Sequence, residues 1–381
     1  MRILLLTIDF PPAPGGVQNL LARLADGLAR RHRVRVLTRA QRCDVQWDRE
    51  RFYRVIRTPS PGFLPFDLGW LLLRACAEIL CHRPDLVICG HILLGPFCML
   101  LARAFRIPYI AMAYAYEVRA PRMRQIAGVA LRGATRVVTI SEFSRQAILA
   151  HGILADRIAV IRPGPALTSH DGTGKIRQRL PAKAGDRILL SVSRLAERYK
   201  GHDMVIRALP LICAKVPDVR YVIVGDGWLR PYLERLAISL GVRDAIVFVG
   251  EVSDADLDAW YRRCDIFILA SRESAVGGGS EGYGIVFVEA NLRGKPVIGG
   301  RSGGIPDAVI DEVTGLLVNP EDAGEIADAV VRLLSDDQLA ARLGAEGRRR
   351  AQEELSWENY VSAFDRVIAS VGRPLPTSPT T

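Results

Sequence analysis

The sequence predicts an α/β protein of two domains, each with a parallel sheet and crossover helices. Short apolar runs of strand length alternate with helical patterns along most of the chain, which is typical of such sheets. The alternation stops at 164–174, a segment rich in Gly, Ser and Thr, and then resumes. The chain has 381 residues. At about 150 residues per domain, this length suffices for two domains that each bury a core.

In the first half, strands and helices are expected to follow one another with short connections. Apolar runs predict strands at 2–8, 33–38, 85–90, 108–113 and 135–140, and an amphipathic pattern predicts a helix at 17–30. Residues 164–174 (GPALTSHDGTG) lack any such period and are the expected interdomain linker.

The same pattern is found in the second half. Strands are predicted at 187–193, 220–224, 245–250, 265–270 and 296–299, and helices at 202–215, 254–263 and 285–293. Gly294 and Pro296 mark the end of the last of these helices, because glycine favours a helix terminus and proline cannot continue a helix. Helices are predicted to close the chain, and 372–381 to form a disordered tail. In such sheets, ligands bind beyond the carboxyl ends of the strands.

The composition is that of an ordinary globular protein. Hydrophobic residues make up 49% and charged residues 24%, which excludes disorder as the main state. The seven cysteines show no Cys-x-x-Cys spacing and no histidine at zinc spacing. They are expected to be reduced core residues, with no disulfide and no metal site.

The charge is unevenly distributed. Residues 1–170 contain 24 Arg, no Lys and 11 acidic residues, a net charge of +13, while the whole chain carries +10. A basic first domain favours an anionic partner, such as a phosphate-rich substrate, a membrane surface or a nucleic acid. The alternative is an arginine-rich surface that is merely solvated.

The segment Phe63–Leu80 is the most apolar part of the chain. Its charges, Asp67, Arg74 and Glu78, interrupt it too often for a helix that spans a bilayer. It is predicted as a helix that either packs on the first domain or lies on a membrane surface. The chain begins with a strand pattern and no apolar leader, so a cytoplasmic location is expected.

Two loops carry groups suited to anions. Gly15 and Gly16 follow the first strand and precede a helix, where backbone N–H groups are free; a tight turn without a ligand is the alternative. Arg194 leaves the strand 187–193, and Lys200 follows six residues later, just before a helix. A guanidinium and an ammonium at a helix start suit a diphosphate, although a surface loop would also fit.

The most informative segment is Ser271–Glu289 (SRESAVGGGSEGYGIVFVE). Glu281 lies in a glycine-rich loop, and Glu289 lies in the helix that follows. The N–H groups of Ile285 and Val286, at the start of that helix, would be free for phosphate oxygens. Two carboxylates suit the recognition of sugar hydroxyls, and a charged Glu in an apolar helix needs a partner.

Together these motifs resemble retaining glycosyltransferase family 4, whose GT-B fold has two Rossmann-like domains with parallel sheets that face a central cleft. The similar motifs occur in the family's order along nearly the whole chain: GGVQ, SRL…KG, VGDG, Glu281-x7-Glu289, GKPVI and SGGIP. The loop SRESAVGGGSEGYGIVFVEA is most similar to the GDP-mannose-dependent phosphatidylinositol mannosyltransferase branch.

The resemblance implies a role for each domain. Residues 1–168 would bind the acceptor, 169–355 would bind the nucleotide sugar, and a helix at 356–371 would pack back on the first domain. Arg194 and Lys200 would hold the donor diphosphate and Glu289 the ribose hydroxyls. The sugar would be held by Glu281 and by the backbone of Gly282, Tyr283, Gly284 and Ile285, and Val286 would also belong to the donor site. The nucleobase would lie near Val252, and Gly16 would meet the phosphates or the acceptor.

One position departs from the family pattern. The family usually has a histidine that contacts the donor sugar in the segment matching 109–118, and here Tyr114 and Tyr116 stand before Glu117. Tyrosine can donate a hydrogen bond but cannot become a cation. His91, at the end of the strand 85–90, is another strand-end histidine. Tyr114 and His91 are therefore both candidate catalytic residues.

The expected function is that of a retaining hexosyltransferase without a metal or other cofactor. It would move a hexose, with mannose favoured, from a GDP- or UDP-sugar to a lipid-linked or small-molecule acceptor. Its basic face would suit peripheral binding to an anionic membrane. A nucleotide-sugar epimerase is the alternative, disfavoured because the first domain shows no clear set of catalytic acids and bases. Nucleic-acid binding is disfavoured because the aromatics, 7% of residues, form no stacking platform among the arginines.

Overall fold

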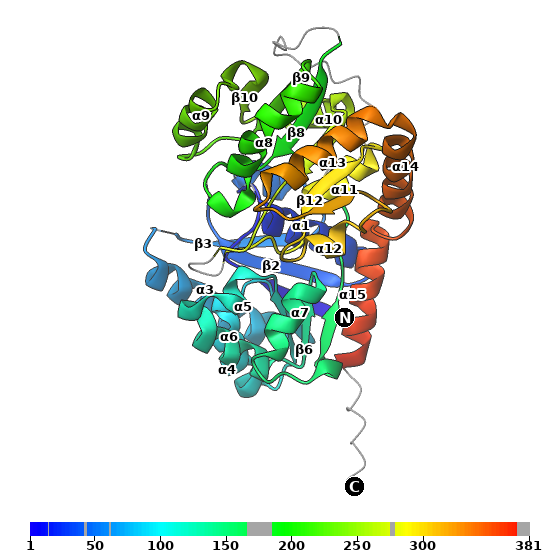
Figure 1. Ribbon diagram of the computed structural model, residues 1–381. Coiled ribbons are helices and arrows are strands. Elements are labelled where there is room, and N and C mark those ends of the chain that lie inside the picture. Colours follow the sequence, from blue (N-terminus) through cyan, green and yellow to red (C-terminus); the bar gives the residue numbers. More distant parts are fainter. Residues whose placement is uncertain (14, 42–43, 61, 166–184, 275–278, 372–381) are drawn as a thin grey trace. The chain divides into compact units, whose positions relative to one another are not determined.

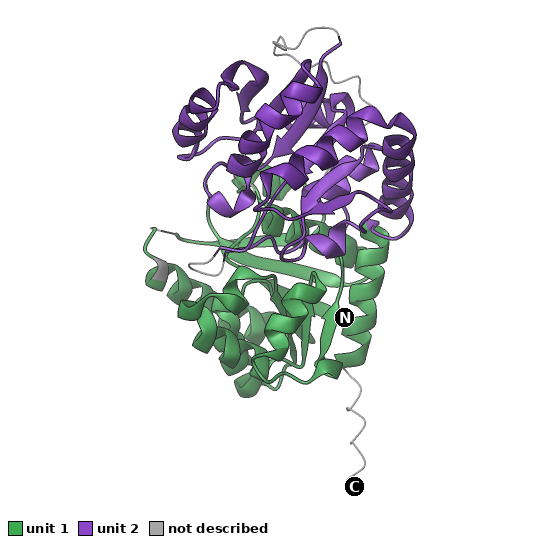
Figure 2. Ribbon diagram, in the orientation of Figure 1, with its two compact units in different colours: residues 1–163, 357–381 green, residues 164–356 purple. Residues whose placement is uncertain are grey.

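The computed structural model describes residues 1–13, 15–41, 44–60, 62–165, 185–274 and 279–371. The chain forms two compact units (Figure 2). Unit 1 comprises residues 1–163 and 357–381, and unit 2 comprises residues 164–356; the sequence predicts divisions at 168 and 355. Three segments of interest lie outside the described residues: most of the predicted linker (166–174), part of the glycine-rich loop (275–278) and the predicted tail (372–381).

In its described residues, unit 1 contains a parallel sheet of seven strands in the order β3-β2-β1-β4-β5-β6-β7. Figure 1 labels β2, β3 and β6 of this sheet. The strands are β1 (Arg2–Leu6), β2 (Arg33–Arg39), β3 (Arg54–Thr58), β4 (Leu86–Cys89), β5 (Tyr109–Ala113), β6 (Arg136–Thr139) and β7 (Ile158–Val160). The helices are α1 (Gly16–Ala29), α2 (Asp44–Arg49), α3 (Leu64–His82), α4 (Gly95–Phe105), α5 (Tyr116–Arg119), α6 (Arg124–Gly133), α7 (Glu142–Leu149) and α15 (Trp357–Val371). Short 3₁₀ turns are η1 (Ile92–Leu94), η2 (Pro121–Met123) and η3 (Ala155–Arg157).

Unit 2 has a parallel sheet of six described strands in the order β10-β9-β8-β11-β12-β13. The strands are β8 (Arg187–Val192), β9 (Val219–Val224), β10 (Ile246–Gly250), β11 (Ile266–Leu269), β12 (Val297–Gly300) and β13 (Leu316–Val318). The helices are α8 (His202–Lys215), α9 (Arg230–Ser239), α10 (Asp254–Arg263), α11 (Ile285–Leu292), α12 (Ile305–Ala308), α13 (Ala323–Ser335) and α14 (Asp337–Glu353). Short 3₁₀ turns are η4 (Arg198–Lys200) and η5 (Arg243–Ala245). The predicted α/β class with two parallel sheets is confirmed.

Each sheet reverses its strand order at one point. In unit 1 the reversal lies between the neighbours β1 and β4, and in unit 2 it lies between β8 and β11. The loops beyond the carboxyl ends at such a point form the usual ligand crevice of an open α/β sheet. These loops carry Asp9 and His91 in unit 1, and Arg194, Lys200 and Glu281 in unit 2.

Helix α3 contains the apolar segment predicted at 63–80. Leu71, Ala75 and Ile79 are buried in the core of unit 1, as expected for the inner face of an amphipathic helix. Its buried acids face strand β2: Glu78 lies 2.8 Å from Arg35, and Asp67 lies 3.6 Å from Arg39. The helix therefore packs on the first domain, and its charges are paired there.

The outer face of α3 is apolar as well. Phe66, Trp70, Leu73 and Leu80 recur at helical spacing along it, and all four side chains are exposed. The sequence offered two alternatives for this segment, packing on the first domain or lying on a membrane surface. The inner face of α3 fits the first alternative, and its exposed outer face is the one that the second would use. Among the described residues, no helix is long and apolar enough to cross a membrane.

The last described helix, α15, belongs to unit 1 and packs on α1. Gly27 of α1 lies so close to Val361 that a Cβ atom at this position would overlap that side chain. Asp365 of α15 pairs with Arg31 at 2.7 Å and with His32 at 3.0 Å. An apolar contact and an ion-pair cluster therefore fix the two ends of the chain together.

Candidate functional site

In unit 2, the predicted cation Lys200 and the predicted sugar-binding Glu281 are in direct contact. Lys200 Nζ donates to Glu281 Oε2 at 2.7 Å, and the side chains are only 17% and 15% exposed. Burial alone would lower the pKa of Lys200, but the carboxylate of Glu281 outweighs it and the pKa is raised. The ammonium is therefore charged at neutral pH and held in one place.

The backbone beside Glu281 is fixed by the segment Ser302–Ile305. The N–H of Gly304 donates to the Glu281 carbonyl oxygen at 2.8 Å. Gly303 has a φ of 57°, and a Cβ atom there would lie 2.6 Å from the same oxygen, so only glycine fits this close approach. The SGGIP motif of the sequence thus acts as a support for the Glu281 loop.

Arg194, the other predicted cation, lies in a different environment. Its side chain is 78% exposed and pairs with Glu197, three residues further along the same loop, at 2.8 Å. An exposed pair of this kind contributes little and breaks readily. Arg194 is therefore free to turn toward an anion, whereas Lys200 is already fixed.

A buried histidine lies at the centre of a hydrogen-bonded chain beneath this loop. His202, the first residue of α8, has Nε2 2.7 Å from Ser193 Oγ and Nδ1 2.9 Å from Tyr221 Oη. Tyr221 Oη lies 2.9 Å from Ser191 Oγ, which in turn donates to the carbonyl oxygen of Ile268. The chain connects the carboxyl end of β8 to its neighbours β9 and β11.

The direction of this chain follows from its last member, because a carbonyl oxygen can only accept. Ser191 donates to Ile268, so Tyr221 donates to Ser191. His202 then donates to Tyr221 through Nδ1–H. In the neutral ring Nε2 is an acceptor for the Ser193 hydroxyl, which also lies 3.1 Å from the carbonyl oxygen of Arg194. Burial lowers the pKa of His202 to about 4, so the neutral form required by this arrangement predominates at pH 7.

Glu289, predicted to bind ribose, is buried in α11. Its Oε2 accepts a 2.8 Å hydrogen bond from the hydroxyl of Tyr261 in α10. Burial, with Glu289 beside it, raises the pKa of Tyr261 well above its usual value, so the hydroxyl remains a donor. Behind this pair, Arg293 is ion-paired with Asp258. Tyr261 therefore orients the carboxylate of Glu289, and the Arg293–Asp258 ion pair lies next to these two residues.

The start of α11 leaves backbone N–H groups uncapped by any side chain. The residue before the helix is Gly284, and the first turn contains no acidic residue. Ile285 and Val286, predicted to present their N–H groups, are half-buried at this end, and Tyr283 is buried beside them. Such a helix start attracts anions. The neighbouring Gly282 is half-buried in the same loop.

Val252, predicted near the nucleobase, follows β10 and is half-buried. Gly250, which ends β10, accepts a 2.8 Å hydrogen bond from the N–H of Gly225 at the end of β9. The loops after β9 and β10 are thus tied together at the same edge of the sheet as Lys200 and Glu281.

In unit 1, His91 and Asp9 meet beyond the ends of β4 and β1. His91 Nδ1 accepts from the N–H of Leu93 at 3.2 Å, so the ring proton lies on Nε2, which points to Asp9 Oδ2 at 3.5 Å. Burial lowers the pKa of His91, although Asp9 and Glu117 oppose this effect. His91 is therefore a neutral donor at a strand end.

Tyr114 lies one strand further along, at the end of β5. It is buried, and its hydroxyl donates to the carbonyl oxygen of Gly90 at 3.1 Å, so its proton is already used inside unit 1. Burial raises the pKa of Tyr114 well above its usual value. Tyr116, by contrast, is exposed at the first position of α5.

Gly16 is the first residue of α1, and the residue before it, Gly15, has no side chain that could cap the helix. A Cβ atom at Gly16 would have no neighbour within 4 Å, so the space in front of it is open. Its free N–H groups match the predicted anion-binding role.

Two aspartates, Asp254 and Asp256, have the Asp-x-Asp spacing that can hold a metal ion. They belong to the first turn of α10, where Ser253 accepts from the Asp256 N–H at 3.2 Å and donates to its carboxylate at 2.7 Å. They therefore serve as the acidic start of a helix. The described part of the chain contains no group of three or more His, Cys, Asp or Glu residues suited to a metal ion.

Sequence reasoning missed the residues that orient the site: His202, Tyr221 and Tyr261. None belongs to a motif, because each acts through a contact between elements far apart in the chain. His202 alone had a sequence signal, since it directly follows the Lys200-Gly201 pair at a helix start.

These two sheets and their loops belong to a glycosyltransferase. Residues 14–167 match the family described as Glycosyltransferase Family 4, and residues 173–350 match the family Glycosyl transferases group 1. The chain belongs to this family, and the predicted enzyme class is confirmed.

The relatives include two bacterial mannosyltransferases. The GDP-mannose-dependent alpha-(1-6)-phosphatidylinositol monomannoside mannosyltransferase of Mycolicibacterium smegmatis is 34% identical, covering 93% of this chain and 95% of the relative. The corresponding enzyme of Corynebacterium glutamicum, named for a monoacylated substrate, is 31% identical and covers 98% and 99%.

Solved structures confirm the GT-B fold. HepE of Anabaena, in complex with UDP, has a TM-score of 0.80 and 23% identity, covering 97% of this chain and all of the other. Sucrose-phosphate synthase of Thermosynechococcus elongatus has a TM-score of 0.79 and 23% identity, covering 97% and 98%.

Proposed function

We propose that this glycosyltransferase transfers mannose, with retention, from GDP-mannose to a lipid acceptor of the phosphatidylinositol class. The main support is the similarity of nearly the whole chain to enzymes named for this donor and acceptor, at 31–34% identity. The solved neighbours titled with UDP are less similar, at 23% identity. A GDP-sugar is therefore the favoured donor and a UDP-sugar the alternative.

The observation that carries the proposal in unit 2 is the fixed Lys200–Glu281 pair at 2.7 Å. A diphosphate would bind the Lys200 ammonium, Arg194 and the N–H groups at the start of α11. Glu281 would accept from hydroxyls of the mannose while keeping Lys200 charged. Glu289, oriented by Tyr261, would accept from the ribose hydroxyls.

The same groups would stabilise the leaving group. As the bond between the sugar's anomeric carbon and the phosphate oxygen breaks, its electron pair remains on the diphosphate. Lys200, Arg194 and the start of α11 supply positive potential there, which is the usual way in which an enzyme lowers such a barrier. The acceptor hydroxyl forms the new bond to carbon, and its proton passes to the departing phosphate oxygen. We infer that no metal ion is needed for this step.

In unit 1, we assign the role of the family histidine to His91 rather than to Tyr114. His91 lies beyond the end of β4 and directs its Nε2–H toward Asp9. The Tyr114 hydroxyl instead donates to the carbonyl oxygen of Gly90. A sugar or acceptor oxygen could replace Asp9 as the partner of His91. Gly16, at the uncapped start of α1, would bind a phosphate of the acceptor or donor.

A lipid acceptor lies in a membrane, and we propose that α3 brings the enzyme there. Its outer face exposes Phe66, Trp70, Leu73 and Leu80, and the first 170 residues carry a net +13. Aromatic side chains suit the headgroup boundary, and basic residues are attracted to an anionic leaflet. Peripheral association with the cytoplasmic surface of a membrane would follow.

Product analysis tests this function directly. The purified enzyme is incubated with GDP-mannose or UDP-glucose and with phosphatidylinositol, and the products are identified by mass spectrometry with and without EDTA. We expect a mannosylated lipid when GDP-mannose is the donor and none when UDP-glucose is. The yield should be the same with and without EDTA. Transfer only from the UDP-sugar would reject the donor. Conversion of the donor without any acceptor would favour an epimerase, and activity restored only by Mg²⁺ or Mn²⁺ would reject the metal-free step.

A further inference from the structure

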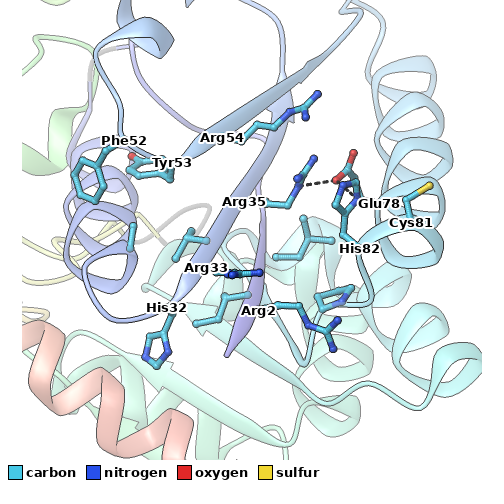
Figure 3. Close-up of a pocket in the computed structure, with 15 residues that line it drawn as sticks. Arg2, His32, Arg33, Arg35, Phe52, Tyr53, Arg54, Glu78, Cys81 and His82 are labelled. Carbon is cyan, nitrogen blue, oxygen red and sulfur yellow. Dashed lines mark ion pairs between the residues drawn. The ribbon is translucent and has the colours of Figure 1, made fainter.

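Unit 1 has a second concave site at the opposite edge of its sheet. A pocket of about 610 Å³ opens at the amino ends of β1, β2 and β3, beside the end of α3 (Figure 3). Strand β1 has five residues, which places this edge about 16 Å from the carboxyl end of β1, where Asp9 and His91 follow. The pocket is therefore distinct from the groups assigned to glycosyl transfer.

Four arginines lie on one face of the sheet in this pocket. The strand register pairs Arg2 with Arg33 and Arg35 with Arg54, and register partners in a parallel sheet point to the same side. Arg33 and Arg35 are two residues apart on β2 and so also share a face. Figure 3 shows these side chains following one another across the three strands.

The acidic groups nearby do not balance this charge. Glu78, 3% exposed, is shared by Arg35 at 2.8 Å, Arg74 at 2.9 Å and His82 at 3.3 Å. Arg2 pairs with Asp85. Among the described residues, the side chains of Arg33 and Arg54 have no ion pair.

One donor of these four arginines is buried and has no partner. The Nη2 of Arg35 is buried and makes no hydrogen bond to any described residue. A buried donor on a charged group is costly to leave unsatisfied, and native structures rarely do so. Four guanidinium groups held side by side without a bound anion repel one another as well.

We propose that this pocket binds a ligand with a phosphate group. Guanidinium groups match the oxygens of phosphate in geometry as well as charge, and several arginines together form the usual phosphate clamp. The volume is that of a small-molecule site, and Leu4, the register partner of Arg35, adds an apolar residue on the same face of the sheet. The phosphate belongs either to a soluble phosphoester or to the headgroup of an anionic lipid.

The test compares two double variants with matched loss of charge. Arg33→Ala/Arg54→Ala removes the two unpaired cations, and Arg49→Ala/Arg103→Ala removes two exposed arginines of unit 1 outside the pocket. Inorganic phosphate and glycerol 3-phosphate are titrated at constant ionic strength. Binding is followed by calorimetry and by the NMR signal of the Arg35 Nε–H group. Equal unfolding midpoints verify that both variants are folded.

We expect saturable binding that shifts the Arg35 signal, is weakened at least tenfold in the pocket variant and changes less than twofold in the control. Lys200→Ala should leave this binding unchanged, which separates it from the diphosphate site of the proposed function. Vesicles with phosphatidic acid distinguish the two sources of the phosphate group. If the protein binds these vesicles through Arg33 and Arg54 but does not bind the soluble esters, the ligand is a lipid headgroup. The proposal is overturned by equal weakening in both double variants, by loss of binding in Lys200→Ala, or by no binding of esters or vesicles.

Discussion

Lys200 and Glu281 lie 81 positions apart in the chain and form an ion pair of 2.7 Å between two loops of unit 2. The pair means that the group for the diphosphate and the group for the sugar cannot be altered independently. Removing either partner changes the charge, the position and the pKa of the other.

The first prediction concerns the pH dependence of nucleotide binding. Burial lowers the pKa of Lys200, and Glu281, together with Tyr199 and Glu197, outweighs it, so Glu281→Gln should lower the pKa. A diphosphate binds the protonated ammonium, which exists below the pKa. In Glu281→Gln the affinity for GDP should therefore fall at a lower pH than in the wild type. Calorimetric titration with GDP from pH 7 to 10 measures this, and identical profiles would contradict it.

The two cations should differ in their effect on stability. Lys200→Met leaves a largely buried carboxylate without its partner, which should cost about 2–4 kcal/mol, near the range for buried pairs. Arg194→Ala should change stability by less than about 0.5 kcal/mol because its pair is exposed. The double variant Lys200→Met/Glu281→Leu should recover most of the loss. Urea unfolding of the three variants is the measurement, and a double variant that is no more stable than Lys200→Met would exclude the coupling.

His202 should make unit 2 acid-sensitive. Its pKa in the folded state is about 4, below the ordinary 6.5, so the unfolded chain binds a proton more readily between these values. Stability from the neutral histidine is present above pH 6.5 and is lost as the pH falls toward 4. The free energy of unfolding should therefore decrease by about 2 kcal/mol between pH 7 and pH 5.

The matched comparison is His202→Gln, which keeps a donor and an acceptor but cannot be protonated. Its stability should fall less than that of the wild type between pH 7 and pH 5, as measured by urea unfolding at each pH. An equal fall in both proteins would show that other groups cause the acid sensitivity.

Tyr261→Phe should weaken nucleotide binding. It removes the 2.8 Å hydrogen bond that orients Glu289. A hydrogen bond to a charged group contributes about 1.5–3 kcal/mol, so the affinity for GDP should fall roughly tenfold or more. Tyr360→Phe is the control, because that buried hydroxyl in unit 1 has no partner among the described residues. Equal affinities for GDP in the two variants would remove Tyr261 from the site.

The outer face of α3 should decide membrane binding. Trp70→Ser/Leu73→Ser should abolish most co-sedimentation with anionic vesicles at low salt, whereas Leu211→Ser/Ile238→Ser, on exposed positions of unit 2, should not. Binding by the wild type should decrease with added salt and be absent with neutral vesicles. A wild type that stays in the supernatant with anionic vesicles would favour a soluble acceptor.

Local signals account for the elements that the sequence predicted. The helices at 202–215 and 254–263 have the predicted bounds, because Gly201 precedes the first and the Ser253 side chain caps the second. The edge strands β3, β7 and β13 went unpredicted. Strand β3 has two arginines among its five residues, β7 is only half-buried, and β13 is buried but has only three residues.

The motifs of the candidate site could be predicted from the sequence, but the contacts between them could not. The spacing Glu281-x7-Glu289 and the cations Arg194 and Lys200 are local patterns. That Lys200 pairs with Glu281, while Arg194 remains exposed, depends on how the loops after β8 and β11 meet. No spacing in a sequence encodes such a contact between distant segments.

The position of α15 determines the order in which this protein can be completed during synthesis. The ribosome releases residues 357–371 after all of unit 2, yet these residues cover Gly27 of α1 and pair with Arg31 and His32. Until these residues have been made, the side of α1 that contains Gly27 is not covered by α15. Unit 1 therefore cannot be completed until α15 has been made, after all of unit 2.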